Sequence, residues 1–264
     1  MTVHHNTTIS VSATAYHVEF ESKPTRIQAG EPVELAFTIR NSTGEIAHDL
    51  KIVHERAIHL LVVSEDLSEF YHLHPEQEAD GRFHLVYTFP QAGHYRLYAD
   101  YAPLGADQIV DQLSLHIDGE ARAAIALIED DILTKSVNGL RFTITANQPL
   151  RAGKAIMLDF AVEDEQTCQP VSDLQPYLGA LAHLVVISED GSEFLHVHPM
   201  EHHEPLISDH SNHADSSTDH ASHSSASQIS AHTRFPRAGL YKIWAQFQRH
   251  GQVITVSFVV RVAE

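Results

Sequence analysis

The sequence has one cysteine, three methionines and one tryptophan among its 264 residues. Cys168 cannot form a disulfide within the chain, and soft sulfur ligands of the kind that hold Cu(I) are scarce. No apolar run is long enough to span a bilayer. Residues 1–8 have neither the basic nor the apolar stretch of an export signal, so we expect a soluble, cytoplasmic protein from the residues alone.

Positive charge is also in short supply. Lys and Arg number 17 against 35 Asp and Glu, a formal net charge of -18, which argues against binding nucleic acid or an anionic membrane. Histidine is abundant, with 22 residues. Imidazole is the commonest protein ligand for borderline divalent metals, so this composition favours cation binding over nucleic-acid binding.

An internal duplication is the main feature of the chain. Residues 59–75 and 183–199 align without a gap and share twelve of seventeen residues, including three histidines in each copy. Two further parallels are 29–37 with 152–160, and 89–99 with 235–245. The offset between matching residues of the two copies grows from 124 at the histidines to 146 at the last parallel. The second copy therefore carries an insertion at about 201–227. We therefore predict two repeats, 1–120 and 121–264.

Short alternating apolar runs between Gly, Pro, Asn and Asp predict an all-β protein. About seven strands per repeat indicate two tandem immunoglobulin-like β-sandwich domains. Tyr95 and Tyr241, each after Ala-Gly, resemble the tyrosine corner of such folds. Residues 119–139 join the repeats, with either a helical turn or an early strand near 121–127. The expected strands are 16–23, 32–40, 57–64, 69–74, 82–89, 94–101 and 108–117, then 140–147, 154–163, 181–188, 193–198, 229–235, 240–248 and 252–262.

The duplicated histidines lie in a predicted β-hairpin, because Ser-Glu-Asp-x-Ser separates two apolar runs. A turn centred on Asp66-Leu67 puts His59 opposite His74 and Leu61 opposite His72. Residues two apart share a face, so three imidazoles converge on one patch of sheet. Such a patch suits Zn²⁺ or Cu²⁺. The alternative is a set of half-buried histidines bonded to backbone. The candidate ligands are His59, His72 and His74 in repeat one, and His183, His196 and His198 in repeat two.

Neighbouring residues supply further candidates. Asp100 is a candidate fourth ligand, although repeat two has Gln246 at that position. Tyr98 and Trp244 either wall the site or form a contact between domains. Beyond these, His54, Glu55, His84 and His94 lie near the hairpins and can assist in repeat one.

The insertion is a low-complexity segment with too little apolar surface to fold alone. Its histidines can bind divalent ions as a buffer or a loading arm, or the segment is a solvated linker. These additional metal candidates are His202, His203, His210, His213, His220 and His223.

The pattern His-Leu-x-Val-x-Ser-Glu-Asp-x-Ser-x-Phe-x-His-x-His-Pro, followed by Phe-Pro-x-Ala-Gly-x-Tyr-x-Leu, resembles bacterial β-sandwich proteins labelled YtkA-like. That resemblance implies an extracytoplasmic location and a link with copper or other heavy-metal handling. It also implies a metal role for the six motif histidines.

The leading hypothesis is a non-enzymatic protein that sequesters, buffers or delivers Cu²⁺ or Zn²⁺, with a His triplet in each repeat and a metal-handling partner protein. One alternative is a cupin-like metalloenzyme, since His72-x-His74-x-Glu76 with His94 is similar to the cupin ligand set. Against it, repeat two has Leu240 in place of His94. The other alternative is a protein-interaction module in which metal binding is incidental.

Overall fold

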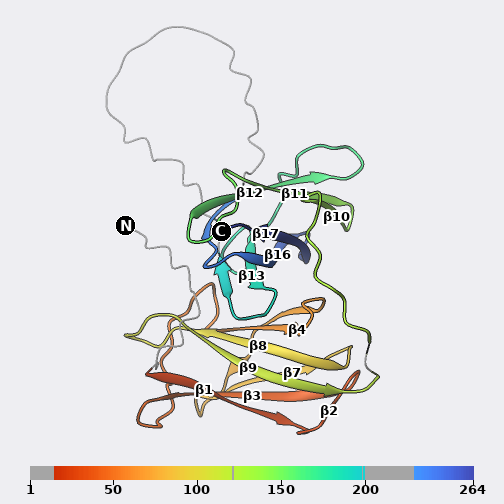
Figure 1. Ribbon diagram of the computed structural model, residues 1–264. Coiled ribbons are helices and arrows are strands. Elements are labelled where there is room, and N and C mark those ends of the chain that lie inside the picture. The colour runs from red at the N-terminus through yellow and green to blue at the C-terminus, as the bar shows by residue number, and fades with distance from the viewer. Residues whose placement is uncertain (1–14, 121, 198, 200–228) are drawn as a thin grey trace, which may run out of the picture.

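The chain folds into two β-sandwiches in tandem, and the computed structural model describes residues 15–120, 122–197, 199 and 229–264 (Figure 1). Each repeat has two sheets, so the predicted fold class is confirmed. In repeat one the sheets run β1-β3-β7-β6 and β2-β9-β8-β4-β5. In repeat two they run β10-β11-β12-β15 and β14-β13-β16-β17.

The strands of repeat one are β1 (Tyr16–Lys23), β2 (Ile27–Gln28), β3 (Pro32–Asn41), β4 (Ile58–Ser64), β5 (Phe70–Leu73), β6 (Glu76–Gln77), β7 (Phe83–Thr88), β8 (Gly93–Tyr101) and β9 (Ile109–Asp118). Those of repeat two are β10 (Thr134–Val137), β11 (Leu140–Ala146), β12 (Ala155–Asp164), β13 (His183–Ser188), β14 (Phe194–Val197), β15 (Ile229–Arg234), β16 (Gly239–Arg249) and β17 (Gln252–Val262). All fourteen predicted strands are present. The short strands β2, β6 and β10 were missed, because two to four residues carry no periodic signal.

Each repeat encloses its own apolar core between its two sheets. In β3, Val33, Leu35 and Phe37 point inward and are at most 1% exposed, as the alternating pattern requires. One core draws on residues 18–117 and the other on residues 140–262. These ranges lie on either side of the predicted boundary at residue 120.

Both tyrosine corners form as predicted. Tyr95 Oη donates to the carbonyl of Gln91, and Tyr241 Oη donates to the carbonyl of Arg237, each at 3.0 Å. A buried hydroxyl needs a partner, and a carbonyl four residues upstream provides one. The same bond in both repeats indicates that the corner predates their divergence.

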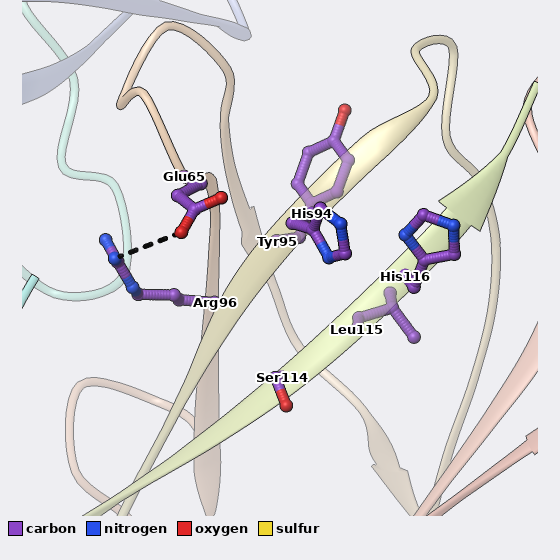
Figure 2. A pocket seen from close by; sticks show the side chains of 7 residues that line it. All are labelled: Glu65, His94, Tyr95, Arg96, Ser114, Leu115 and His116. Atoms are coloured by element: carbon purple, nitrogen blue, oxygen red, sulfur yellow. Dashed lines mark ion pairs between the residues drawn. The ribbon is translucent and has the colours of Figure 1, made fainter. Parts of the chain in front are cut away.

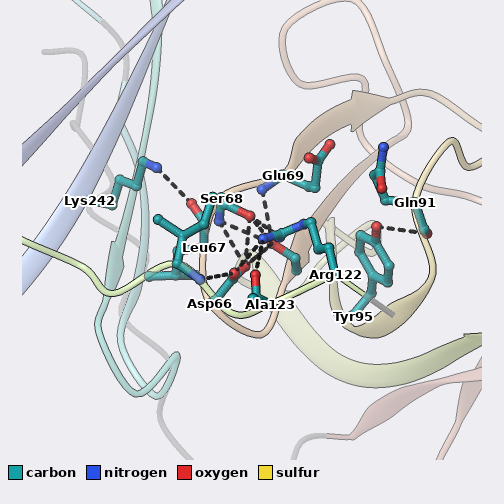
Figure 3. Close-up of polar contacts among 11 residues, drawn as sticks. Asp66, Leu67, Ser68, Glu69, Gln91, Tyr95, Arg122, Ala123 and Lys242 are labelled. Atoms are coloured by element: carbon teal, nitrogen blue, oxygen red, sulfur yellow. Dashed lines mark hydrogen bonds and ion pairs between the residues drawn. The ribbon is translucent and has the colours of Figure 1, made fainter. Parts of the chain in front are cut away.

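Residues 122–130 have no regular secondary structure, so neither the helical turn nor the early strand is present in the described part of 121–127. Arg122 anchors it to the β4–β5 turn by donating to both carboxylate oxygens of Asp66 at 2.9 Å, and it also contacts Ser68 (Figure 3). The amide of Ile125 donates to Asp66 as well. Burial opposes ionisation of Asp66, but these hydrogen bonds outweigh burial and hold the pKa of its carboxyl well below the usual range.

The two repeats pack against each other through a third apolar cluster. It joins the outer faces of the β4–β8 and β13–β16 layers, which lie one above the other in Figure 1. Every residue of β4 and of β13 is therefore buried. This explains why both strands have continuous apolar runs rather than alternation, since both of their faces are covered.

Related aromatic pairs line this interface. Tyr98 of repeat one stacks on Phe194 of repeat two, with ring centroids 4.7 Å apart. Phe70 stacks on Trp244 at 4.9 Å. Because Tyr98 corresponds to Trp244 in the duplication, and Phe70 to Phe194, each repeat presents the same face to the other. Tyr98 and Trp244 thus form a domain contact rather than an exposed wall.

Candidate metal centre

The hairpin register is the one that the sequence predicts. Leu61 pairs with His72 and Leu60 with Leu73, so His59 comes opposite His74. In repeat two, Val185 pairs with His196 in the equivalent position. The motif histidines therefore point to the outer face of their sheet, the face that packs against the other repeat.

This packing brings the histidines of both repeats into one cluster. The ring of His59 lies 5.3 Å from His72, 5.2 Å from His74 and 5.2 Å from His196 between centroids. His183 lies 5.9 Å from His196 and 6.1 Å from His72. The prediction of a separate site in each repeat is wrong in this respect, because the domain interface merges the two sets. His198 lies outside the described residues.

Three of these histidines have the geometry of a metal site. His59, His72 and His196 each offer a ring nitrogen, and the three nitrogens lie within 4.8 Å of one another. His59 and His196 are 2% exposed. Among the residues that the structure describes, this is the one group of three or more His, Cys, Asp or Glu side chains that meets such a criterion. It draws on both repeats, so neither repeat holds the whole group.

In each of these three rings, one nitrogen faces a hydrogen-bond acceptor. We call it the outward nitrogen and the other ring nitrogen the inward one. His59 Nε2 lies 2.9 Å from the carbonyl of Val53, and His196 Nδ1 lies 2.9 Å from Asp100 Oδ2. His72 Nδ1 lies 2.7 Å from Gln246 Oε1. A carbonyl or carboxylate oxygen can only accept, so each outward nitrogen carries the proton. The inward nitrogens then carry lone pairs, which is how metal-ligating histidines are oriented in proteins.

The inward nitrogens are close enough to share a cation. His59 Nδ1 and His72 Nε2 are 3.0 Å apart. With both outward nitrogens protonated, two lone pairs face each other, and this is repulsive unless a proton or a metal ion lies between them. Two nitrogens at 2.0–2.1 Å from a tetrahedral Zn²⁺ are separated by roughly 3.3 Å, similar to the observed distance.

Burial keeps these imidazoles neutral. Desolvation lowers the pKa of His59 and lowers those of His72 and His196 well below the ordinary value. It also lowers the pKa of His74 to about 3 and that of His183 to about 4. A shared proton is therefore disfavoured near pH 7, whereas neutral imidazole is the form that binds metal.

Asp100 and Gln246 occupy matching places in the two repeats and act across the interface. Asp100 pairs with His59 along the sheet but contacts His196 of the other repeat, and Gln246 pairs with His183 but contacts His72. Burial raises the pKa of Asp100 to about 6. The sequence predicts Asp100 as a candidate fourth ligand, whereas here its carboxylate contacts the ring of His196. The role of Gln246 was missed, although a polar residue in an apolar strand was a usable signal.

Three further histidines and one tyrosine border the trio. The ring of His54 lies 5.5 Å from that of His183 between centroids, so His54 borders the cluster as predicted. His183 Nε2 lies 2.7 Å from the carbonyl of Tyr177, and its Nδ1 therefore carries a lone pair. His74 Nε2 is buried without a hydrogen-bond partner in the described structure. The cluster thus holds more imidazole nitrogen than three ligands require.

Other predicted residues lie elsewhere. His84 Nε2 lies 2.8 Å from Glu34 Oε1 in the opposite sheet of repeat one. His94 pairs with His116, six residues from Asp100 along β8, a distance of roughly 20 Å. Glu76 is exposed in β6. With His94 distant as well, the cupin-like set of His72, His74, Glu76 and His94 does not converge. The insertion candidates His202, His203, His210, His213, His220 and His223 lie outside the described residues.

Solved structures resemble this chain at low identity and low TM-score. The Escherichia coli adhesin FdeC has 15% identity and a TM-score of 0.28 over 97% of this chain and 66% of that chain. A Salmonella alpha-2-macroglobulin has 12% identity and a TM-score of 0.31 over 95% and 15%. Invasin, a bacterial integrin-binding protein, has 10% identity and a TM-score of 0.25 over 92% of this chain and 39% of that chain. This chain thus spans less than two thirds of each, and such values support no argument about function.

No curated protein matches the sequence. Among the described residues, no helix has the length and apolar character needed to cross a bilayer. A family model matches residues 10–117 and again residues 135–264, which agrees with the internal duplication. The chain belongs to the family described as Domain of unknown function (DUF8832), of which it carries two copies.

Proposed function

We propose that this protein binds one divalent transition-metal ion, Cu²⁺ or Zn²⁺, at the interface between its repeats. His59, His72 and His196 supply the ligands, and the protein sequesters, buffers or delivers the ion without catalysing a reaction. The observation that carries the proposal is the convergence of three ring nitrogens within 4.8 Å, in rings that each also lie against a hydrogen-bond acceptor.

The charge of the site supports a cation. Asp100 is 1% exposed, and burial disfavours its ionised form. A metal ion bound beyond His196 compensates this buried carboxylate through the imidazole ring. The donor set, all imidazole with no sulfur, suits Cu²⁺ and Zn²⁺. The resemblance to YtkA-like proteins agrees with this chemistry.

A purely structural role is the competing explanation, in which the histidines satisfy one another as a buried polar network. That explanation accounts for the bonds to Val53, Asp100 and Gln246. It leaves the 3.0 Å contact between His59 and His72 without a bridging proton. It also leaves His74 Nε2 buried without a partner in the described structure. Buried polar atoms in such a position are usually satisfied by an ion or a water.

Calorimetric titration of the whole chain with Zn²⁺ and with Cu²⁺ tests the proposal. We expect the tightest binding step to disappear when His72 and His196 are both replaced by alanine. The control variant replaces His84 and His232, strand histidines outside the cluster, and keeps that step. The insertion histidines are present in both variants, so their binding cancels. An unchanged tightest step in the His72→Ala, His196→Ala variant overturns the assignment.

The physiological ion needs a separate measurement. Copper binds most nitrogen sites more tightly than zinc, so preference in a titration says little about the ion in the cell. Elemental analysis of protein purified from its own source without chelators identifies it.

A protein-interaction role is the second candidate, and a specific surface favours it. Ile52 and Leu104 are 67% and 66% exposed, and their segments are joined by the Lys51 amide to the Ala102 carbonyl and the Leu104 amide to the Asp49 carbonyl. Large exposed side chains on adjacent loops are typical of contact surfaces. If a partner binds fully after exhaustive chelation and is lost with Ile52→Ser, interaction is independent of metal.

A further inference from the structure

A second pair of histidines lies at the opposite end of the interface sheet of repeat one. His94 of β8 and His116 of β9 are direct cross-strand partners, and their ring centroids are 4.4 Å apart with a tilt of 39°. Both side chains are exposed. Both rings line a pocket of about 480 Å³ together with Glu65, Arg96 and Ser114, and they lie next to each other in Figure 2. We infer that His94 and His116 form a separate, exchangeable site for a borderline divalent metal ion.

The arrangement of His116 supports this inference. Its Nε2 lies 3.3 Å from Asp118 Oδ1. The carboxylate of Asp118 attracts a cation that binds at the pair. Asp118 is itself held by Arg26, so the carboxylate is fixed in place.

The spacing of the two rings supports it as well. Each neutral imidazole has one unprotonated ring nitrogen, and rings with centroids 4.4 Å apart bring two such donors to the same region. Two imidazole ligands with water in the remaining positions suit Zn²⁺, Cu²⁺ or Ni²⁺. The net charge of -18 draws cations to the surface. Two protein ligands bind more weakly than three, so this site exchanges its ion readily.

This pair has no counterpart in repeat two. The positions of His94 and His116 correspond to Leu240 and Arg261, which pair with each other across β16 and β17. The site is therefore a property of repeat one, independent of the interface cluster, which lies roughly 20 Å away along β8. His94→Leu introduces the residue that the equivalent strand already accommodates, so the fold tolerates it.

Footprinting with diethyl pyrocarbonate, read by mass spectrometry, tests the inference residue by residue. On the chelator-treated full chain, we expect Zn²⁺ to protect His94 and His116 together. In His94→Leu, His116 is expected to react at its metal-free rate even with Zn²⁺ present. His232, an exposed strand histidine of repeat two, is the internal control and reacts equally under all conditions.

The His72→Ala, His196→Ala variant separates this site from the proposed function. Protection of His94 and His116 in that variant shows that the pair binds metal whether or not the interface cluster does. The inference is overturned if Zn²⁺ leaves the reaction rates of His94 and His116 unchanged. It is equally overturned if His116 stays protected in His94→Leu, because the pair then does not act together.

Discussion

Metal affinity should depend on how firmly the two repeats are docked, because the proposed ligands come from both. Ile187→Ala is the perturbation that isolates this effect. Ile187 is fully buried in the interdomain cluster and lies four residues from His183, roughly 13 Å along β13. It is part of the interface without being a proposed ligand, and its cross-strand partner Phe194 lies two residues from His196 along β14.

The size of the effect follows from the burial. Truncation of a fully buried isoleucine to alanine costs about 2–5 kcal/mol. Since about 1.4 kcal/mol shifts an equilibrium tenfold, the docking constant falls by more than about tenfold. The apparent dissociation constant equals the intrinsic one divided by the docked fraction. Once the two repeats are docked in less than half of the metal-free protein, the Zn²⁺ affinity therefore falls by up to the same factor as the docking constant.

Two measurements check this linkage. Calorimetry of Ile187→Ala should give weaker Zn²⁺ binding than wild type. Reciprocally, Zn²⁺ should slow proteolysis of the segment between the repeats, because ligand and docking stabilise each other equally. Ile156→Ala is the matched control, since Ile156 is equally buried but lies within the core of repeat two.

The reasoning fails if Ile187→Ala binds Zn²⁺ as wild type does while Zn²⁺ leaves the cleavage rate unchanged. That result means that the ligands of one repeat suffice. A loss of affinity in Ile156→Ala as large as that in Ile187→Ala also refutes it, because general instability then explains both.

Three further outcomes are expected. Asp100→Asn should weaken Zn²⁺ binding by about 10–100-fold in calorimetry, since it removes the carboxylate behind a ligand; unchanged affinity contradicts its supporting role. Because burial lowers the folded-state pKa of His183 to about 4, its stabilisation is complete above pH 6.5 and is lost as the pH falls toward 4. Urea unfolding of the metal-free protein should show that decline, reduced in His183→Ala; an equal slope in both is the contrary result. Arg122→Ala should cost about 1.5–3 kcal/mol by urea unfolding, because it removes charged hydrogen bonds to Asp66. Arg26→Ala, at an exposed ion pair, should cost less than about 1 kcal/mol, and equal costs argue against the anchor.

The local structure could be predicted from the residues because its causes are local. Strand positions follow from alternation and turn residues, and the Ser-Glu-Asp-x-Ser turn sets the register that pairs Leu61 with His72. Which face each histidine occupies then follows from the twofold period of a strand. The duplication, both tyrosine corners and the shared face of the motif histidines can therefore be predicted from the chain itself.

The partners of those histidines depend on contacts between distant residues. Nothing in the order of residues says that the outer face of β4 packs on that of β13, although the unbroken apolar run after His59 shows that both faces are covered. Packing of two related faces joins His59 and His72 to His196, and it turns Asp100 and Gln246 toward rings of the opposite repeat. Local periodicity determines which face of a sheet a side chain occupies. Burial of apolar area between the repeats determines which residues contact that face.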